Sequence, residues 1–226
     1  MSGLDAKVVV ITGAAGALGS ATAAHFAALG ARLALLDVVA IDGPHFSRVC
    51  DLTRLDACRE AAAAIEREVG PIDVLANIAG GFTMGDPVHE VSDETWDFLM
   101  NLNARTVLNM VRAVVPAMVE RGRGKVVNIG AGAGQHGVAL LGAYSASKSV
   151  VIRLTESMAG ELKEKGINVN CILPSVIDTP ANRKAMPDAD FSRWVRPEAL
   201  AKVIAFLCSE AAGPIHGAAL PVSGLS

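Results

Sequence analysis

The sequence VVVITGAAGALG, residues 8–19, decides the fold of this chain. Val8 to Ile11 form a short apolar run, which is typical of a strand buried on both faces of a parallel sheet. A glycine-rich turn follows, and an alanine-rich helix is expected from Ser20 to Leu29. Such a turn lets backbone N–H groups approach a phosphate at the positive end of the helix. The pattern therefore predicts a nucleotide site whose contacts come from Gly13, Ala15, Gly16, Ala17, Leu18 and Gly19.

The rest of the chain repeats this alternation of strand and helix. Further strands are expected near residues 32–36, 46–50, 72–76, 125–129, 167–173 and 218–222, with helices between most of them. One long helix is expected from Ser92 to about Val119, and a polar loop from Asn182 to Arg196. This order predicts an α/β fold, a Rossmann-type doubly wound parallel sheet of about seven strands, as a single domain over residues 1–226. Ligands of such sheets bind at the carboxyl ends of the strands.

Acidic residues end the second and third expected strands. Asp37 lies about 20 residues beyond the glycine turn, where a carboxylate accepts hydrogen bonds from ribose hydroxyls and repels a 2′-phosphate. No arginine follows it and none stands in the turn, so the sequence favours NAD(H) over NADP(H). Asp51, followed by Leu52, has two interpretations. It either reaches the adenine amino group or caps the helix that begins at Leu55.

Tyr144 and Lys148 stand four residues apart at the start of an expected helix. This spacing puts both side chains on one helix face. A lysine ammonium beside a phenol lowers the pKa of the phenol, so Tyr144 is a candidate general acid and base. Upstream, where a hydroxyl would assist such a proton donor, the chain has Gly130 and Ala131. Asn103 is a polar residue in the middle of an expected helix, which marks it as a candidate functional residue.

Composition excludes several classes of function. The 226 residues are 51% hydrophobic with a net charge of −3, and no run of Lys and Arg offers a nucleic-acid surface. No apolar run reaches the roughly 18–20 residues of a membrane span, and the chain enters its first strand directly, so neither an anchor nor a signal peptide is expected. The four cysteines and five histidines show no metal-ligand spacing. We expect a cytoplasmic protein with reduced thiols and no metal, which acts on a small molecule.

Spaced motifs along the chain resemble those of the short-chain dehydrogenase/reductase family. They are Thr12-Gly13…Gly19, Asp51, Asn77-x-Ala79-Gly80, Asn103, Tyr144-x-x-x-Lys148 and Pro174…Thr179-Pro180, and together they cover essentially the whole chain. The resemblance implies a nicotinamide cofactor bound by a Rossmann fold. It also implies a homodimer or a homotetramer.

The resemblance further implies roles for individual residues. Tyr144 would be the general acid/base, Lys148 would hold the nicotinamide ribose and lower the pKa of Tyr144, and Asn103 would anchor a proton-relay water. Ile177 and Thr179 would contact the carboxamide of the cofactor. The remaining implied cofactor contacts are Asn77, Ala79, Gly80 and Pro174.

One branch of this family, the dihydropteridine reductases and their bacterial relatives, resembles the chain more closely. The likeness is carried above all by Leu173-Pro-x-x-x-Asp-Thr-Pro-x-Asn-Arg-Lys-x-Met-Pro-x-Ala-Asp-Phe-Ser-x-Trp194. Ala131 fits this branch, because members of the branch keep the Tyr and the Lys but lack the substrate-binding Ser that most family members carry at this position. The resemblance implies reduction of a quinonoid dihydropterin or a similar conjugated acceptor.

Three interpretations of function remain open from the sequence. In a conjugated acceptor the charge spreads over ring nitrogens, so a hydroxyl missing at Ala131 matters less; Phe82 and Trp194 would then be flat walls for the ring, or would simply pack. An ordinary alcohol/ketone enzyme would need a substitute donor such as Gln135, His136 or a water, because losing one donor costs on the order of 10²–10³ in rate. The third interpretation is a cofactor-binding sensor or scaffold without turnover.

Overall fold

The computed structural model describes residues 3–226 and contains one sheet of seven parallel strands. They are β1 (Val8–Thr12), β2 (Arg32–Asp37), β3 (Phe46–Val49), β4 (Ile72–Asn77), β5 (Gly124–Ile129), β6 (Ile167–Pro174) and β7 (Ala219–Val222). Their spatial order is β3-β2-β1-β4-β5-β6-β7, so the chain reverses its direction of travel between β1 and β4. This confirms the expected doubly wound Rossmann-type sheet, whose ligand crevice lies at that switch point.

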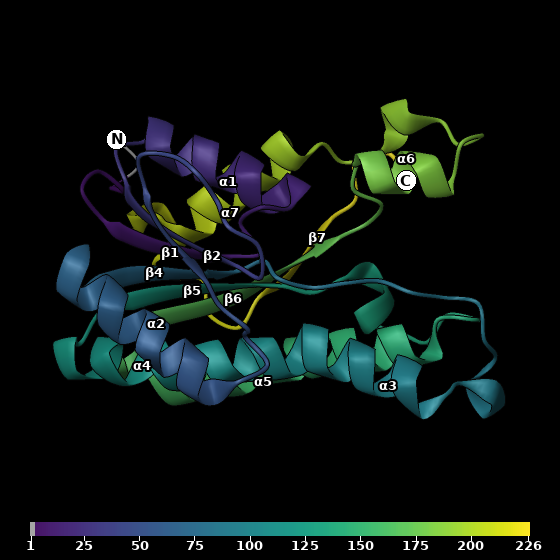
Figure 1. Cartoon of the computed structure of the whole chain (residues 1–226), viewed down its shortest axis with the longest axis horizontal. Helices are drawn as coiled ribbons and strands as arrows, with labels where there is room; N and C mark the ends of the chain where they lie inside the picture. Colours follow the sequence, from purple (N-terminus) through teal and green to yellow (C-terminus); the bar gives the residue numbers. More distant parts are fainter. Residues whose placement is uncertain (1–2) are drawn as a thin grey trace.

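Helices cover both faces of the sheet (Figure 1). One face carries α1 (Ala17–Ala28) and α7 (Pro197–Cys208), and the other carries α2 (Leu55–Glu68), α4 (Thr106–Arg121) and α5 (Gly142–Leu162). Side chains alternate between the two layers along each strand. In β1, Val9 and Ile11 pack with α1 and α7, while Val8 and Val10 pack with the other helices. The inner strands are buried on both faces and are therefore largely apolar, whereas the edge strands β3 and β7 are only partly buried.

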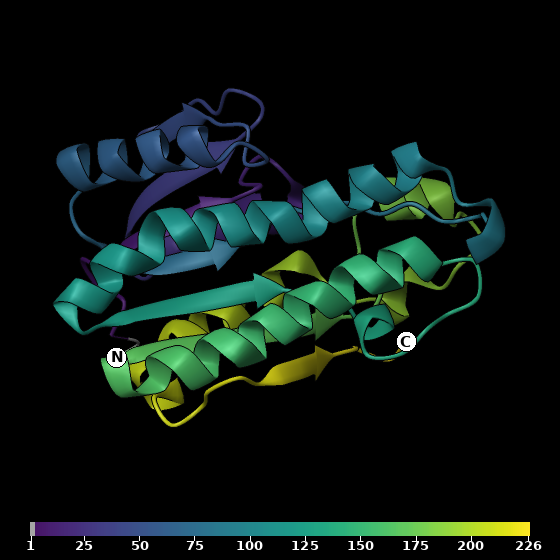
Figure 2. The same ribbon diagram turned by 90° about the horizontal axis from the view of Figure 1, so that it is seen from below.

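Two short helices lie beyond the carboxyl ends of the strands. They are α3 (Asp93–Leu99), which follows the long loop after β4, and α6 (Pro180–Ala185), which follows β6. In Figure 1, and in the view from below in Figure 2, both project past the end of the sheet to which the strand arrows point. This end of the molecule therefore has walls built from segments far apart in the sequence.

The prediction of one continuous α-helix from Ser92 to Val119 is wrong in the middle of this range. Residues Met100–Arg105 form a π-helical segment between α3 and α4. The start was anticipated, since the Ser92 side chain accepts a hydrogen bond from the backbone N–H of Thr95 at 3.1 Å. A π-helical turn is rare and often marks a functional site. Asn103 lies within this segment.

The polar loop expected from Asn182 to Arg196 is also partly helical. Thr179 caps α6, accepting from the backbone N–H of Asn182 at 3.2 Å, and Pro180 occupies the first helical turn. A 3₁₀ turn follows at Phe191–Arg193. The signal for this helix, a threonine followed by a proline, was present in the sequence.

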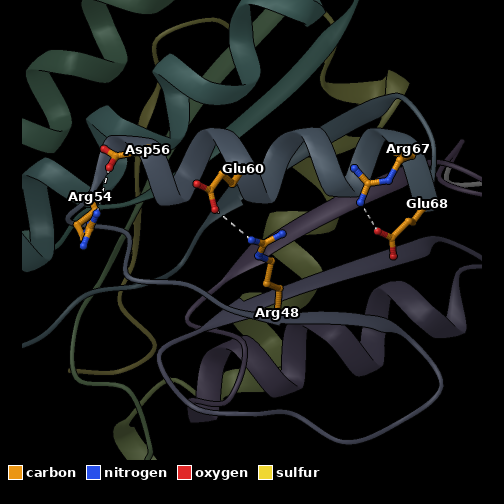
Figure 3. A network of polar contacts seen from close by, with 6 residues as sticks. All are labelled: Arg48, Arg54, Asp56, Glu60, Arg67 and Glu68. Atoms are coloured by element: carbon orange, nitrogen blue, oxygen red, sulfur yellow. Dashed lines mark hydrogen bonds and ion pairs between the residues drawn. The ribbon is translucent and has the colours of Figure 1, made fainter.

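The outer side of α2 is a solvated, charged surface (Figure 3). Arg48 lies 3.3 Å from Glu60, and the neighbouring pairs are Arg54 with Asp56 and Arg67 with Glu68. Exposed pairs of this kind contribute only about 0–1 kcal/mol each. These pairs therefore mark the solvent-exposed face of α2 and contribute little to stability.

Residues 3–226 include all the cysteines and histidines of the chain and every helix that the structure describes. All four cysteines are buried and free. Within the described residues, no group of three or more His, Cys, Asp and Glu is arranged to hold a metal ion. Across the same part of the chain, no helix combines the length and apolar character needed to cross a membrane.

Candidate active site

Thr12, at the end of β1, joins the two loops that meet at the switch point. Its hydroxyl oxygen accepts from the backbone N–H groups of Ile78 at 2.9 Å and Ala79 at 3.1 Å. Gly13 follows with φ +64°, and a Cβ there would lie 2.8 Å from the Cα of Ala79. Glycine is therefore required, both for its backbone conformation and for this close approach.

The glycine turn leaves the start of α1 open to a ligand. Gly16 is the N-cap of α1, and no side chain caps the first turn. N–H groups there, beginning at Ala17 and Leu18, are free to bind an anion at the positive end of the helix. Gly19 allows α1 to press on the turn, since a Cβ would lie 2.1 Å from the Gly13 carbonyl oxygen. The residues thus fit the pyrophosphate of a dinucleotide.

Asp37, at the end of β2, points toward the glycine turn. One carboxylate oxygen accepts from the backbone N–H of Ala15 at 2.9 Å, and the other accepts from that of Val38 at 2.7 Å. These bonds place a negative charge beside the turn. The position matches the one at which a ribose-binding acid is expected.

The N-cap interpretation of Asp51 is wrong. The N-cap of α2 is Arg54, which makes no side-chain cap. Asp51 instead accepts at Oδ1 from the backbone N–H of Thr53 at 2.9 Å and from its hydroxyl at 2.6 Å, and these bonds lower the pKa of Asp51. Leu52 is buried, and its carbonyl accepts from the side chain of Asn109 at 3.0 Å. An exposed carboxylate is therefore held at the carboxyl end of β3.

Asn77, the last residue of β4, belongs to a buried chain of amides. Its Nδ2 donates to Oδ1 of Asn128 at 2.9 Å, and Asn128 donates to the hydroxyl of Thr155 at 2.9 Å. Oδ1 of Asn77 is buried without a protein partner among the described residues. A buried acceptor is costly to leave unpaired. It is therefore an atom that suits a hydrogen-bond donor from a bound cofactor.

The π-helical segment brings Asn103 against the loop that follows β4. Its Oδ1 accepts from the backbone N–H of Gly81 at 2.9 Å, and its Nδ2 donates to the Gly81 carbonyl at 3.0 Å. The same Nδ2 donates to the hydroxyl of Ser147 at 3.0 Å, and Ser147 donates to the Tyr144 carbonyl at 2.8 Å. Sequence reasoning missed Ser147, although its place between Tyr144 and Lys148 in the motif was visible.

The side chains of Asn103 and Lys148 both approach the backbone at Gly80. A Cβ on Gly80 would lie 2.9 Å from Oδ1 of Asn103 and 3.2 Å from Nζ of Lys148. The candidate catalytic side chains from the π-helical segment and from α5 therefore approach each other at the carboxyl edge of β4.

The expected lowering of the Tyr144 pKa by Lys148 is wrong for this structure. Burial raises the pKa of Tyr144 to about 12, and burial lowers the pKa of Lys148 to about 8. The lysine ammonium donates to the Ile129 carbonyl at 2.9 Å instead of acting on the phenol. The spacing of four residues does put both groups on α5, but the end of β5 determines where Nζ points.

Ala131 is buried in extended backbone just after β5. Its methyl group stands where the family resemblance implies a serine hydroxyl. The two proposed substitutes, Gln135 and His136, are exposed to solvent. Within residues 3–226, neither of these two side chains is buried beside Ala131.

Of the two aromatic residues expected to form walls, only Phe82 contacts a candidate catalytic side chain. Its ring packs edge-on against the Tyr144 ring, with centroids 4.9 Å apart, and it remains half exposed. Trp194 is buried, and its ring packs 4.8 Å from that of Phe191. Trp194 is thus a packing residue in this structure.

The run from Leu173 to Trp194, on which the expected likeness to dihydropteridine reductases rests, holds several contacts within itself. Asp178 accepts two hydrogen bonds from the Arg183 guanidinium, at 2.6 and 2.8 Å, which lowers the pKa of the Asp178 carboxyl. The same guanidinium lies 4.8 Å from the centre of the Phe191 ring. A parallel β-bridge between Ile177 and Val195 joins the two ends of this run.

Three expected cofactor contacts lie at or just after the end of β6, and two of them, Ile177 and Thr179, are expected at the carboxamide. Pro174 ends the strand. Ile177 forms the bridge described above, and its carbonyl accepts from the Asn182 side chain at 2.8 Å. The Thr179 hydroxyl accepts from the backbone N–H of Asn182. The hydroxyl of Thr179 is therefore engaged in capping α6.

A small cavity lies beside Tyr144, between the loop after β4, α3 and the start of α5. Its volume is about 20 Å³, close to what one bound water requires. Its wall includes Thr83, Asp86, Thr95, Leu140 and Tyr144. Sequence reasoning did not identify Thr83 or Thr95, which carry no motif.

Comparison with known proteins gives concordant matches. The family model described as short chain dehydrogenase matches residues 7–190. The chain is 32% identical to 3-oxoacyl-[acyl-carrier-protein] reductase of Thermotoga maritima, covering 98% of each chain. It is 34% identical to D-threitol dehydrogenase of Mycolicibacterium smegmatis, covering 98% of this chain and 93% of that protein. The crystal structure of levodione reductase superposes with a TM-score of 0.91 at 29% identity, covering 98% of this chain and 97% of that one.

Proposed function

The chain belongs to the short-chain dehydrogenase family, and from this premise we propose that Tyr144 is the general acid/base of an NAD(P)(H)-dependent oxidoreductase. The observation that carries this proposal is the docking of the Tyr144/Lys148 turn of α5 on the π-helical segment through Ser147 and Asn103. The arrangement sits at the switch point, beside the open start of α1.

The proposed chemistry assigns one task to each side chain. When bound, the nicotinamide cofactor supplies or accepts the hydride. The Tyr144 phenol donates a proton to the acceptor as it is reduced; with a pKa of about 12, it is protonated at neutral pH, which is the form that reduction needs. Lys148, with a pKa of about 8, is mostly charged at pH 7 and would hold the nicotinamide ribose. Oδ1 of Asn103 keeps a second lone pair, on which a relay water would bind.

For the cofactor, we propose NAD(H) in preference to NADP(H). The carboxylate of Asp37, held beside the glycine turn by Ala15 and Val38, would accept from ribose hydroxyls and repel a 2′-phosphate. Asp51 at the next strand end would reach the adenine amino group. Asn77, Ala79, Gly80 and Pro174, with Ile177 and Thr179, would line the nicotinamide half of the site.

For the acceptor, we propose a conjugated ring such as a quinonoid dihydropterin. The buried methyl group of Ala131 supports this, because a ring that spreads its charge over several atoms has less need of a hydroxyl beside Tyr144. The half-exposed ring of Phe82 beside Tyr144 offers one flat surface.

Replacing Tyr144 with Phe tests the central role. We expect the variant to fold, to bind NADH and to lose at least about 10²-fold in kcat, because the proton donor is gone. The measurement is NADH oxidation with quinonoid dihydropterin, a quinone and a small cyclic ketone. A variant with unchanged turnover on every acceptor would contradict the role of Tyr144 and revive a non-catalytic function.

A second candidate is an alcohol/ketone oxidoreductase. The names of the relatives favour it, since they include a 3-oxoacyl reductase, a D-threitol dehydrogenase and a levodione reductase. Turnover of ketones with none of quinonoid dihydropterin, in the same assay, would select it.

We also propose that the protein works in the cytoplasm as a homodimer or a homotetramer. Large apolar side chains are exposed on α3 and α7, namely Trp96, Phe98 and Phe206. Self-association would cover such side chains. Light scattering during gel filtration would then give a multiple of the 23.3 kDa chain mass.

A further inference from the structure

A second polar group is needed wherever an acceptor carries more than one heteroatom. Tyr144 can protonate only one of them, and Ala131 offers no hydroxyl. A buried heteroatom without a partner weakens binding by about 5- to 150-fold. A free polar side chain beside Tyr144 would therefore have to bind the second heteroatom.

Most polar groups around Tyr144 are already engaged or face elsewhere. Ser147 bonds to Asn103 and to the Tyr144 carbonyl, and both hydrogens of the Asn103 amide are used. Gln135 is exposed and does not line the cavity beside Tyr144. Ser147 and the Asn103 amide group therefore cannot donate to a second heteroatom without breaking existing bonds, and Gln135 lies off the cavity wall.

Among the hydroxyls that line this cavity, Thr83 differs from Thr95. Thr95 lies 3.3 Å from the Ser92 hydroxyl and shares a hydrogen bond with it. The Thr83 hydroxyl has no protein partner within residues 3–226, and the residue is half-buried on the cavity wall with Tyr144.

The segment that carries Thr83 is fixed on both sides. Before it, the Phe82 ring rests against the Tyr144 ring. After it, the backbone N–H of Gly85 donates to the Leu140 carbonyl at 3.1 Å. A hydroxyl between two such anchors is pre-positioned, which lowers the entropy lost when it binds a ligand. The cavity itself has room for about one oxygen atom.

We propose that Thr83 is a specificity-determining residue whose hydroxyl binds a second heteroatom of the acceptor while Tyr144 protonates the first. This inference rests on the proposed reduction of a conjugated acceptor at Tyr144. Ala131 does not line the cavity, so Thr83 approaches from the loop after β4 and not from the side of the missing serine. An acceptor ring with heteroatoms at two positions would use both hydroxyls, whereas a simple ketone has a single oxygen.

A matched pair of substitutions tests the proposal. Thr83→Val keeps the shape and removes the hydroxyl, and Thr83→Ser keeps the hydroxyl and removes a methyl group. With quinonoid dihydropterin and NADH, we expect Thr83→Val to lose about 10- to 100-fold in kcat/KM, mainly through KM, and Thr83→Ser to stay within about threefold of wild type. On a small cyclic ketone, Thr83→Val should change kcat/KM by less than about threefold.

Circular dichroism and the Kd for NADH, measured by fluorescence, would check that both variants fold and bind the cofactor. The proposal is overturned if Thr83→Val keeps dihydropterin activity, if it loses the same factor on the ketone, or if Thr83→Ser loses as much as Thr83→Val. Wild-type enzyme that does not reduce dihydropterin would overturn the proposed acceptor and this inference together. Active wild-type enzyme with an equally active Thr83→Val would overturn only the role of Thr83.

Discussion

Tyr144 and Lys148 have pKa values displaced in opposite directions by one cause, burial. The neutral form of each group is favoured in the folded protein, so the pKa of the phenol rises to about 12 and that of the ammonium falls to about 8. Reduction by proton donation from Tyr144 needs the neutral phenol. A charged Lys148 at pH 7 is kept at some cost, which its hydrogen bond to Ile129 partly offsets.

The cost of Lys148 should appear as pH-dependent stability. Because its pKa falls from 10.5 to about 8 on folding, the unfolded chain binds more protons between these values, so stability rises with pH across this window. The full penalty, about 3 kcal/mol, is present below pH 8. Lys148→Met should therefore be more stable than wild type at pH 7, with the difference shrinking toward pH 10.

Urea unfolding of both proteins at pH 7, 8, 9 and 9.5 measures this difference. All other titrating groups are present in both proteins. The difference between their unfolding free energies therefore reports mainly on Lys148. Parallel stability curves over the whole range would show that Lys148 keeps its ordinary pKa in the folded protein.

At the scale of elements, the site depends on close contact between a turn, a helix and a loop. The turn after β1 touches the loop after β4 at Gly13, and α1 touches the same turn at Gly19. The π-helical segment adds a third contact, since the Asn103 side chain bonds to both the backbone N–H and the carbonyl of Gly81. Each contact is made with backbone atoms, which cannot move aside as a flexible side chain can.

Gly19→Ala should therefore disturb the turn. The added Cβ would meet the Gly13 carbonyl oxygen at 2.1 Å and the Ala14 Cα at 2.7 Å. We expect a loss of about 2–3 kcal/mol in unfolding free energy and weaker NADH binding, because the turn must open. The measurements are urea unfolding and the Kd for NADH.

Gly160→Ala is the matched control for this variant. Gly160 lies on the exposed side of α5, and a Cβ there meets nothing within 4 Å. Alanine in a helix interior should stabilise the protein by about 0.5–1 kcal/mol. If Gly19→Ala were as stable as Gly160→Ala, the close packing of α1 on the turn would be refuted.

At the scale of the whole molecule, binding at the switch point should stabilise every layer at once, since the cofactor would contact loops from several strands. A ligand at 100 times its Kd adds about 2.7 kcal/mol to unfolding free energy. For a chain of this size, that corresponds to a rise in Tm of about 5–10 °C.

We expect NADH to raise the Tm more than an equal concentration of NADPH, because Asp37 would repel the 2′-phosphate. Thermal scans at matched concentrations measure the two shifts, and Asp37→Ser should bring them closer together. A larger shift with NADPH for the wild-type protein would show that the charge of Asp37 does not set the preference.

The sequence by itself determined the order of elements and the class of fold. Largely apolar runs of four to seven residues, glycine after β1 and helix-start signals are local features, and each acts within a few residues of its position. The same locality made the Tyr144/Lys148 pair and the acid at Asp37 visible. Motif spacing then identified the family.

Tertiary structure alone decided the environment of these residues. The pKa values of Tyr144 and Lys148 depend on burial and on the Ile129 carbonyl, which belongs to another element. The π-helical form of Met100–Arg105, the burial of Trp194 and the place of Thr83 on the cavity wall likewise arise from contacts between distant segments. Such contacts have no local signature in the sequence, because each depends on where the sheet brings the other partner.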